Sequence, residues 1–247
     1  MNNIFNADPE QIEPILKASH QAGLHVIMVG PPGTGKSWSA KTLGMTRGSK
    51  PVAVYLTEDS ARFELVGYDR QVGGDFVLQD GPAPIAWIFG RRLVIDEIDK
   101  CPPAVMSLLL AVLDDPKLAN LILPDGREIT PKKGFHAVCT SNVESLDELP
   151  EALLDRISVR LYVDKPHPNA YLRLPEDIRD IARLSGSAEG VRRTSLRDWI
   201  AVDKLRTKIG DETLAFKSIF GDEASGILTS LEAARTKLQD AGVRNEG

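Results

Sequence analysis

The residues Gly30-Pro31-Pro32-Gly33-Thr34-Gly35-Lys36-Ser37 directly follow a short apolar run at residues 24–29 and precede a stretch of helical character. They satisfy the pattern G-x-x-x-x-G-K-[ST] in the strand–loop–helix context that the pattern requires. The glycines let consecutive backbone N–H groups turn inward around phosphates, and the following helix presents the positive end of its dipole to the same charge. The segment therefore predicts a loop that binds the phosphates of a nucleotide. The alternative, a chance glycine-rich turn, is disfavoured by the flanking strand and helix.

We expect several residues of this loop to contact a bound nucleotide. Lys36 would reach the β- and γ-phosphates, and the hydroxyl of Ser37 would hold Mg²⁺. The expected cofactors are therefore ATP and Mg²⁺. The residues expected to line the nucleotide in this part of the chain are Gly30, Pro31, Pro32, Gly33, Thr34, Gly35, Lys36, Ser37 and Trp38.

A second motif, Arg92-Leu93-Val94-Ile95-Asp96-Glu97, is typical of a buried strand that ends in two acidic residues. A doubly wound sheet binds its ligand at the carboxyl ends of its strands. We therefore expect Asp96 to contact the nucleotide site by binding the hydrated Mg²⁺, and Glu97 to orient or deprotonate the attacking water. A strand that merely ends at a polar surface is the alternative, and the accompanying phosphate loop makes the catalytic interpretation the better one.

Short apolar runs alternate with helical stretches over the first two thirds of the chain. The runs lie at residues 24–29, 52–55, 93–95, 137–140 and 159–163. This alternation predicts an α/β fold, the doubly wound parallel sheet of a P-loop NTPase with helices on both faces. Two segments interrupt it with hairpin character: residues 71–78 turn on Gly73-Gly74, and residues 121–130 turn on Pro124-Asp125-Gly126.

The strand signals stop after Asp164-Lys165-Pro166-His167-Pro168, and helical patterns with glycines between them follow. A proline-rich stretch of this kind is typical of a domain boundary. We predict an α/β nucleotide-binding domain over residues 1–165 and a small helical domain over residues 166–247.

The overall charge and the chain start limit the partners to be expected. A net charge of −5 gives no overall attraction to a polyanion, so nucleic-acid binding would need a local basic patch. The first residues show no basic region followed by an apolar one, and no stretch approaches the ~20 apolar residues that span a bilayer. We therefore expect a cytoplasmic protein without membrane contact.

Cysteine and histidine usage points away from a metal or disulfide framework. The two cysteines, Cys101 and Cys139, form no C-x-x-C pair and are too few for a disulfide framework. This usage is typical of a protein from a reducing compartment. The histidines lack the spacing of a zinc site, so core or surface positions are expected for them. They are His20, His25, His136 and His167.

Together these motifs resemble the MoxR-like branch of the AAA+ ATPases, in the group that also contains the dynein-related and McrB-like modules. GPPGTGKS, LVIDEID, the strand end CTSN and LPEALLDRISVRLYVD occur here in the family's order. The segment GYDRQVGGDFVLQDGPAPIAWIFG between the first two is similar to the family's helix-two insert. The resemblance is specific over residues 24–163 and looser through the C-terminal helices. It implies an ATP hydrolase that works as a ring of identical subunits, expected to be a hexamer.

The resemblance also implies two catalytic residues beyond the motifs above. Asn142 is similar to the sensor-one residue that positions the attacking water, although an asparagine cap is an alternative. Arg156 is similar to the arginine finger that a ring neighbour inserts toward the transferred phosphoryl group, with Arg160 as the competing candidate. An exposed, salt-bridged arginine is the other interpretation of Arg156. The catalytic residues expected are then Lys36, Glu97, Asn142 and Arg156.

The C-terminal domain and the two hairpins have counterparts in the same family. Arg197 best resembles the sensor-two residue of the lid, which would contact the nucleotide, and Arg192 and Arg193 compete for the role. Residues 68–80 correspond to the helix-two insert, and residues 119–131 to the pre-sensor-one hairpin. In the family such loops project toward the pore or face of the ring. Edge hairpins that only cover the sheet are the alternative.

Three classes of function follow. MoxR-like ATPases work beside proteins with a von Willebrand factor A domain, so the leading expectation is a chaperone-like remodeller of a partner protein. A nucleic-acid motor similar to the McrB-like relatives is the second, favoured by cations near the hairpins and disfavoured by the acidic balance. These cations are Arg70, Arg127, Lys132 and Lys133. A nucleotide-gated scaffold is the third, and Asp96-Glu97 argues against it because a scaffold does not need to activate water.

Overall fold

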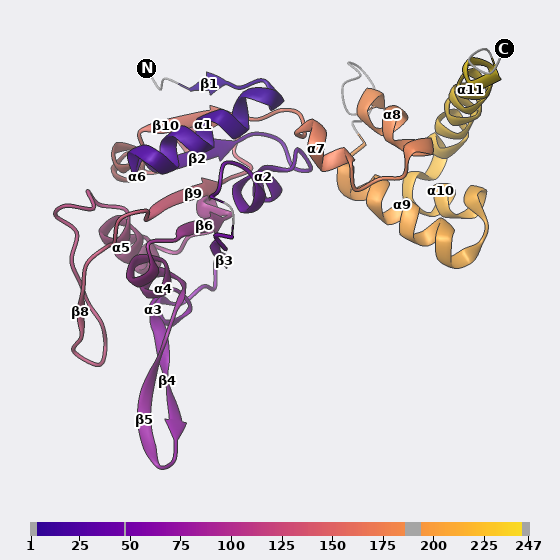
Figure 1. Cartoon of the computed structure of the whole chain (residues 1–247). Helices are drawn as coiled ribbons and strands as arrows, with labels where there is room; N and C mark the ends of the chain where they lie inside the picture. Colours follow the sequence, from indigo (N-terminus) through magenta and orange to yellow (C-terminus); the bar gives the residue numbers. More distant parts are fainter. Residues whose placement is uncertain (1–3, 47, 186–193, 244–247) are drawn as a thin grey trace. The chain divides into compact units, whose positions relative to one another are not determined.

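The computed structural model describes residues 4–46, 48–185 and 194–243. The chain divides into two compact units, each described here by itself (Figure 1). The first comprises Met1–Pro31 and Lys36–Asp164, and the second comprises Pro32–Gly35 and Lys165–Gly247. All strands within the described ranges lie in the first unit. No helix in those ranges combines the length and apolar character that crossing a bilayer demands.

Six parallel strands form the central sheet of the first unit in the described part of the chain, in the order β1-β10-β2-β9-β6-β3. Parallel strands cannot be joined by a tight turn, so the connections cross the faces of the sheet and carry helices. The predicted parallel α/β sheet is confirmed. The edge strand β1 was not predicted, because two residues are too few to form a recognisable apolar run. The strands are β1 (Phe5–Asn6), β2 (Val26–Val29), β3 (Val52–Tyr55), β6 (Arg92–Asp96), β9 (His136–Thr140) and β10 (Val159–Tyr162).

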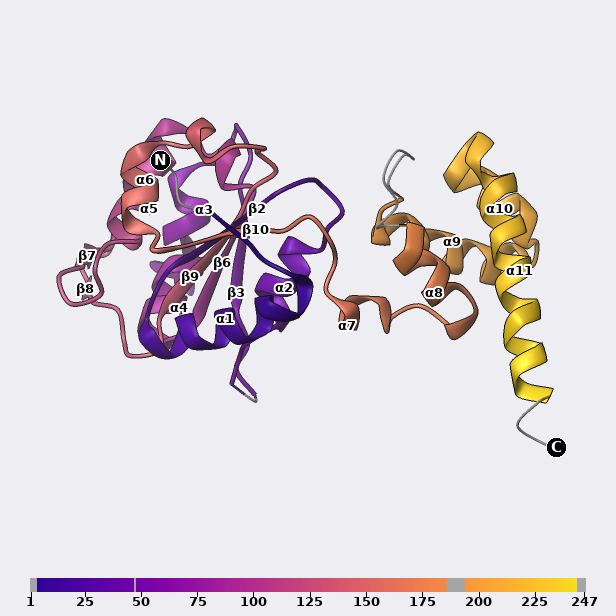
Figure 2. The same cartoon turned by 90° about the horizontal axis from the view of Figure 1, so that it is seen from above.

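Helices cover both faces of this sheet. Val26 and Met28 of β2 belong to a buried cluster with α1 and α2, whereas Ile27 and Val29 belong to a cluster with α4, α5 and α6. Successive strand residues point to opposite faces, which explains why β2 is apolar at every position. Figure 2 shows α1 and α2 on one side of the sheet and α5 and α6 on the other. The helices are α1 (Pro9–Ala22), α2 (Lys36–Thr42), α3 (Arg62–Val66), α4 (Pro82–Phe89), α5 (Pro103–Val112) and α6 (Glu151–Arg156), with short 3-10 turns at Ile98–Lys100 and Leu146–Glu148.

Two antiparallel hairpins extend the first unit. Strands β4 (Gly67–Val72) and β5 (Asp75–Asp80) pair over their whole length around the turn Gly73-Gly74 and project away from the sheet (Figure 1). The second hairpin pairs β7 (Leu121–Ile122) with β8 (Glu128–Ile129). Both hairpins were predicted, and the first is longer than the residues 71–78 expected.

A buried arginine joins the sheet to α1 and α2. The Arg92 side chain is 1% exposed, and its Nη1 donates to the carbonyls of Ala40 (2.9 Å) and Leu43 (2.6 Å) at the C-terminal end of α2. Its Nη2 donates to Gly44 O (3.2 Å) and its Nε to His136 Nε2 (2.9 Å). The unpaired carbonyls at a helix end carry partial negative charge, so they partly compensate the buried cation.

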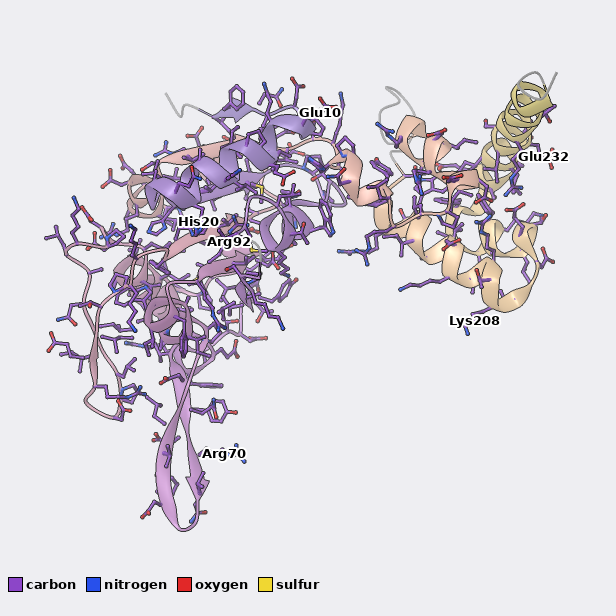
Figure 3. The ribbon with its side chains drawn as sticks, viewed as in Figure 1. Glu10, His20, Arg70, Arg92, Lys208 and Glu232 are labelled. Carbon is purple, nitrogen blue, oxygen red and sulfur yellow. The ribbon has the colours of Figure 1, made fainter. Side chains whose placement is uncertain are left out.

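The histidines complete this cluster. Burial and then the Arg92 charge lower the pKa of His136 to about 3, so its ring is neutral at physiological pH. Because Nε2 accepts from Arg92, the proton lies on Nδ1, which is 3.1 Å from His20 Nδ1. Figure 3 shows His20 of α1 and Arg92 at the same end of the sheet. The sequence predicted core or surface positions for these histidines but not the hydrogen bond between Arg92 and His136.

The second unit is helical in its described residues, as predicted, and its helices pack around an aromatic core. Trp199 is fully buried, and its ring centroid lies 6.0 Å from that of Phe216 and 5.1 Å from that of Phe220. The helices are α7 (Pro168–Tyr171), α8 (Glu176–Ser185), α9 (Leu196–Ile209), α10 (Glu212–Phe220) and α11 (Ala224–Val243), with a 3-10 turn at Gly221–Glu223.

A network of ion pairs connects α8, α9, α10 and α11. Arg206 contacts Asp177 (2.6 Å), Glu212 (3.0 Å) and Asp203 (3.1 Å). Arg235 contacts Asp177 (2.6 Å) and Glu212 (2.8 Å). Because two guanidinium groups share two carboxylates, each ion pair holds the others in place.

Replacing Arg92 by methionine is expected to destabilise the protein by roughly 3 kcal/mol, because buried carbonyls of α2 and His136 lose their donor. Urea unfolding would measure the loss. The control is Arg91→Met, whose guanidinium is half-buried and lies 5.0 Å from the ring centroid of Phe89. That change should cost less than about 1 kcal/mol. Equal unfolding midpoints for the two variants would contradict the anchoring role of Arg92.

Replacing Arg206 by alanine is expected to destabilise the second unit in a pH-dependent manner. Hydrogen bonds from Arg206 lower the pKa of Asp177 from 3.8 to about 2. This depressed pKa contributes stability above the ordinary pKa, and that stability is lost as the pH falls toward 2. The difference in Tm between wild type and Arg206→Ala should therefore be steady near neutral pH and shrink below about pH 4. Thermal unfolding followed by circular dichroism tests this, with the exposed Arg173→Ala as control; a difference that does not change with pH would refute it.

Candidate functional site

The glycine-rich motif forms the loop between β2 and α2. Gly30 has a φ of 137°, and a Cβ at this position would lie 2.4 Å from the carbonyl oxygen of Val163. No side chain fits there, so glycine is required both by conformation and by space. Lys36 is the first residue of α2, and the unpaired N–H groups of the first helical turn lie in and after the motif. The loop therefore offers backbone donors of the kind that bind phosphate groups.

The Lys36 side chain lies inside this loop. Its Nζ donates to the carbonyls of Gly30 and Pro31, both at 2.7 Å, and the residue is 5% exposed. Burial lowers its pKa to about 8, while the carboxylates of Glu97 and Asp99 act in the opposite direction. The structure thus brings this cation close to the acidic end of β6.

Asp96 lies at the carboxyl end of β6 with both carboxylate oxygens occupied. Thr140 Oγ1 donates to Oδ1 (2.9 Å), and Lys41 Nζ contacts Oδ2 (2.5 Å). The Asp96 side chain is 5% exposed, so these partners rather than water satisfy its carboxylate oxygens.

Glu97 and Asn142 are in direct contact. The Asn142 Nδ2 group donates to both carboxylate oxygens of Glu97, at 2.7 and 2.8 Å. Glu97 has a φ of 59°, and no other non-glycine residue in the described ranges has a positive φ. A left-handed backbone at such a residue costs about 1–3 kcal/mol and is concentrated at functional sites. This conformation turns the chain sharply after the strand and holds the Glu97 carboxylate beside the end of β9.

Several residues of this cluster were missed from the sequence. Lys41 lies four residues after Ser37, a spacing that places both on one face of α2, and this was the available signal. Thr140 follows from the parallel register of β6 and β9, which sequence patterns do not specify. The Ser141 hydroxyl donates to Asp99 Oδ1 (2.6 Å), a contact for which the sequence carries no signal.

The two candidate finger arginines lie outside this cluster. Arg156 Nε donates to Leu110 O (2.8 Å) of α5, and its Nη1 donates to Ala152 O (2.9 Å). Arg160 donates from Nη2 to Leu154 O (2.6 Å) and from Nε to Ile157 O (3.2 Å). Neither forms an ion pair within the ranges that the structure describes, so the salt-bridged alternative does not hold for Arg156. Arg156 also borders an open cavity of about 660 Å³.

The remaining predicted binding residues fall on helix starts. Ser37 and Trp38 occupy the first turn of α2 and are half-buried. Arg197 is exposed in the first turn of α9, where Ser195 and Asp198 form a capping box. The competing residues Arg192 and Arg193 lie outside the described residues.

Comparison with known proteins extends these observations. A family model described as "AAA domain (dynein-related subfamily)" matches residues 25–157, more than half of the chain. The chain belongs to this family. The resemblance to the MoxR-like, dynein-related branch of the AAA+ ATPases is thereby confirmed, with nucleotide binding as the family's common property.

The AAA domain has similar curated relatives. An uncharacterised protein from Staphylococcus saprophyticus is 30% identical over 147 residues, covering 56% of this chain and 55% of that protein. Chaperone MoxR1 of Mycobacterium tuberculosis is 28% identical over 149 residues, covering 58% of this chain and 37% of MoxR1. The matched region thus spans about half or less of these relatives' own length.

Solved structures of other proteins share the fold of this chain. A candidate ATPase from Cytophaga hutchinsonii superposes with a TM-score of 0.52 at 21% identity, covering 85% of this chain and 62% of that one. NtrX from Brucella abortus gives a TM-score of 0.52 at 19% identity, covering 81% of this chain and 48% of that one. At such identities the likeness concerns the fold alone.

The oxygen donors of the AAA domain fit Mg²⁺ carried by a nucleotide. Ser37 supplies a hydroxyl and Asp96 a buried carboxylate that already requires a positive partner. Within the described ranges no group of three or more His, Cys, Asp or Glu side chains is placed to hold a metal. Mg²⁺ commonly takes one or two protein oxygens and receives its other ligands from phosphates and water. Ser37 and Asp96 are therefore the residues suited to it.

Proposed function

We propose that this chain is a Mg²⁺-dependent ATPase that works as an oligomeric ring and remodels a partner protein. The single observation that carries the ATPase assignment is the contact of Asn142 with Glu97 beside the buried Lys36. A carboxylate held next to a phosphate-binding lysine is placed to act on water near the terminal phosphate.

Each residue of the site then has a chemical role. The P-loop N–H groups and Lys36 would bind the phosphates, and Ser37 and Asp96 would hold Mg²⁺, which would supply positive charge beside the phosphate oxygens. Glu97 accepts a proton from the attacking water, and Asn142 orients the Glu97 carboxylate and that water. A scaffold that binds nucleotide without turnover has no use for a strained residue such as Glu97.

The position of Arg156 in the described residues supports the proposed ring. Arg156 donates to carbonyls of α5 and α6 and contacts none of the residues at the end of β6. Phosphoryl transfer benefits strongly from an arginine that stabilises charge on the transferred group. We assign this role to Arg156 of a neighbouring subunit. We propose that Arg197 contacts the nucleotide of its own subunit. A hexamer is the arrangement that the family implies.

A protein is the favoured substrate because of the first hairpin. Its exposed side chains include Tyr68, Val72, Phe76 and Val77, of which Phe76 is 75% exposed. Exposed apolar groups on a projecting hairpin suit a protein surface. MoxR1, one of the relatives, is named as a chaperone. A partner with a von Willebrand factor A domain, in the cytoplasm, remains the specific form of this proposal.

A nucleic-acid motor is the second candidate. Arg70 is exposed on the projecting hairpin (Figure 3), and Lys132 and Lys133 are exposed after the second hairpin. Arg127 is less suited to phosphate contacts, because it pairs with Asp80 and Asp125, each at 2.5 Å. Salt-sensitive stimulation of ATP hydrolysis by DNA would favour this candidate.

Arg156→Ala is expected to lower ATP turnover by about a thousandfold while leaving nucleotide affinity nearly unchanged, because the finger acts on the transition state. Since Arg156 also links α5 to α6, a mixing experiment separates the two roles. Arg156→Ala subunits mixed with inactive Glu97→Gln subunits form some interfaces with an intact Glu97 and an intact Arg156. Activity of the mixture above that of either variant supports the shared site. A mixture as inactive as its components would exclude Arg156 as the finger. The same mixing experiment with Arg160→Ala subunits tests the competing candidate.

Tagged Glu97→Gln protein, purified from its native host with ATP and Mg²⁺, is expected to retain a stoichiometric protein partner. Blocked hydrolysis holds the ring in its ATP state, so the partner should be lost on exchange into ADP. Lys36→Ala, which removes a phosphate contact, is the matched control and should capture nothing. ATP-dependent capture of nucleic acid without protein would instead establish the motor.

A further inference from the structure

The ion pair between Lys41 and Asp96 is unusual for its position. It joins the last turn of α2 to the carboxylate that we assign to Mg²⁺, with Nζ 2.5 Å from Oδ2. The Asp96 side chain is 5% exposed, whereas the Lys41 side chain is 41% exposed. One member of the pair is therefore fixed in the sheet, and the other can move into water.

The buried carboxylate requires a counter-charge. Thr140 satisfies Oδ1 by a hydrogen bond but carries no charge, so Lys41 neutralises Asp96. An unpaired buried carboxylate is strongly unfavourable. Mg²⁺ brought by a nucleotide would provide the same compensation at the same acid. Two cations at one carboxylate repel each other, so the metal and Lys41 compete.

We propose that Lys41 is the resident counter-ion of Asp96 and is displaced when Mg²⁺–nucleotide binds, which sets the Mg²⁺ concentration that the site needs. This inference rests on the proposed nucleotide binding. It adds Lys41 to the proposed site as a positioning residue. Lys41 holds the Asp96 carboxylate in place before binding. Its long side chain then moves to solvent, where an ammonium group is well hydrated.

The test is a Mg²⁺ titration of the binding of a fluorescent ATP derivative to the full chain, comparing wild type with Lys41→Met. The Mg²⁺ concentration for half-maximal binding should fall about three- to tenfold in the variant, because the competing cation is gone. Lys41→Arg keeps the charge and should behave as wild type. Lys100→Met removes an equally positive side chain that lies 3.6 Å from Asp99 instead, and should leave the midpoint unchanged.

Thermal unfolding gives a second readout that does not depend on turnover. In EDTA, Lys41→Met should have a lower Tm than wild type, and Mg²⁺–ATP should raise its Tm by more than it raises that of wild type. An equal loss of Tm in both conditions, or a Mg²⁺ midpoint that is unchanged or higher, would overturn the counter-ion role and leave Lys41 as a structural contact. Wild-type protein that binds no nucleotide at any Mg²⁺ concentration would instead refute the proposed function itself.

Discussion

The position of α2, the helix to which we assign phosphate binding, depends on the buried guanidinium of Arg92. This cation has no carboxylate partner in the described chain and is satisfied by His136 and by the terminal carbonyls of α2. A buried charge held by several hydrogen bonds tolerates little displacement, because each lost bond leaves a desolvated polar group. Arg92 and Asp96 begin and end the same strand, β6. The helix that carries Lys36 is therefore fixed relative to the acid with which it would share a nucleotide.

The same helix meets β6 a second time, through Lys41 and Asp96. The two contacts differ in exposure: Arg92 is 1% exposed, whereas the Lys41 side chain is 41% exposed. The first is a permanent anchor, and the second is an interaction that a metal ion can replace. A site that must bind and release a charged ligand repeatedly needs both properties, a rigid frame and a local charge that can rearrange.

The edge of the sheet that we assign to ATP hydrolysis is separate from the surface that we assign to substrate. Lys36, Asp96 and Glu97 lie where the carboxyl ends of the strands meet, and their contacts are polar and largely buried. The β4–β5 hairpin instead exposes apolar groups such as Phe76 on a two-stranded ribbon that has no core of its own to cover them. Apolar surface of this kind is stabilised only by a partner. The division suits an enzyme that hydrolyses ATP at one place and acts on another molecule elsewhere.

The sequence by itself determined the loop, the acidic strand end, the α/β class and the helical C-terminal part. These features are local: glycines at required conformations, apolar runs of strand length, and polar residues directly after them. It did not reveal that Arg92 binds the end of α2, that Lys41 pairs with Asp96, or that Thr140 lies beside that acid. Those contacts join residues 44 to 55 positions apart and follow from strand order, register and helix placement. Only tertiary packing decides which distant polar groups share one buried space, because a buried charge must find its partner wherever the fold brings one.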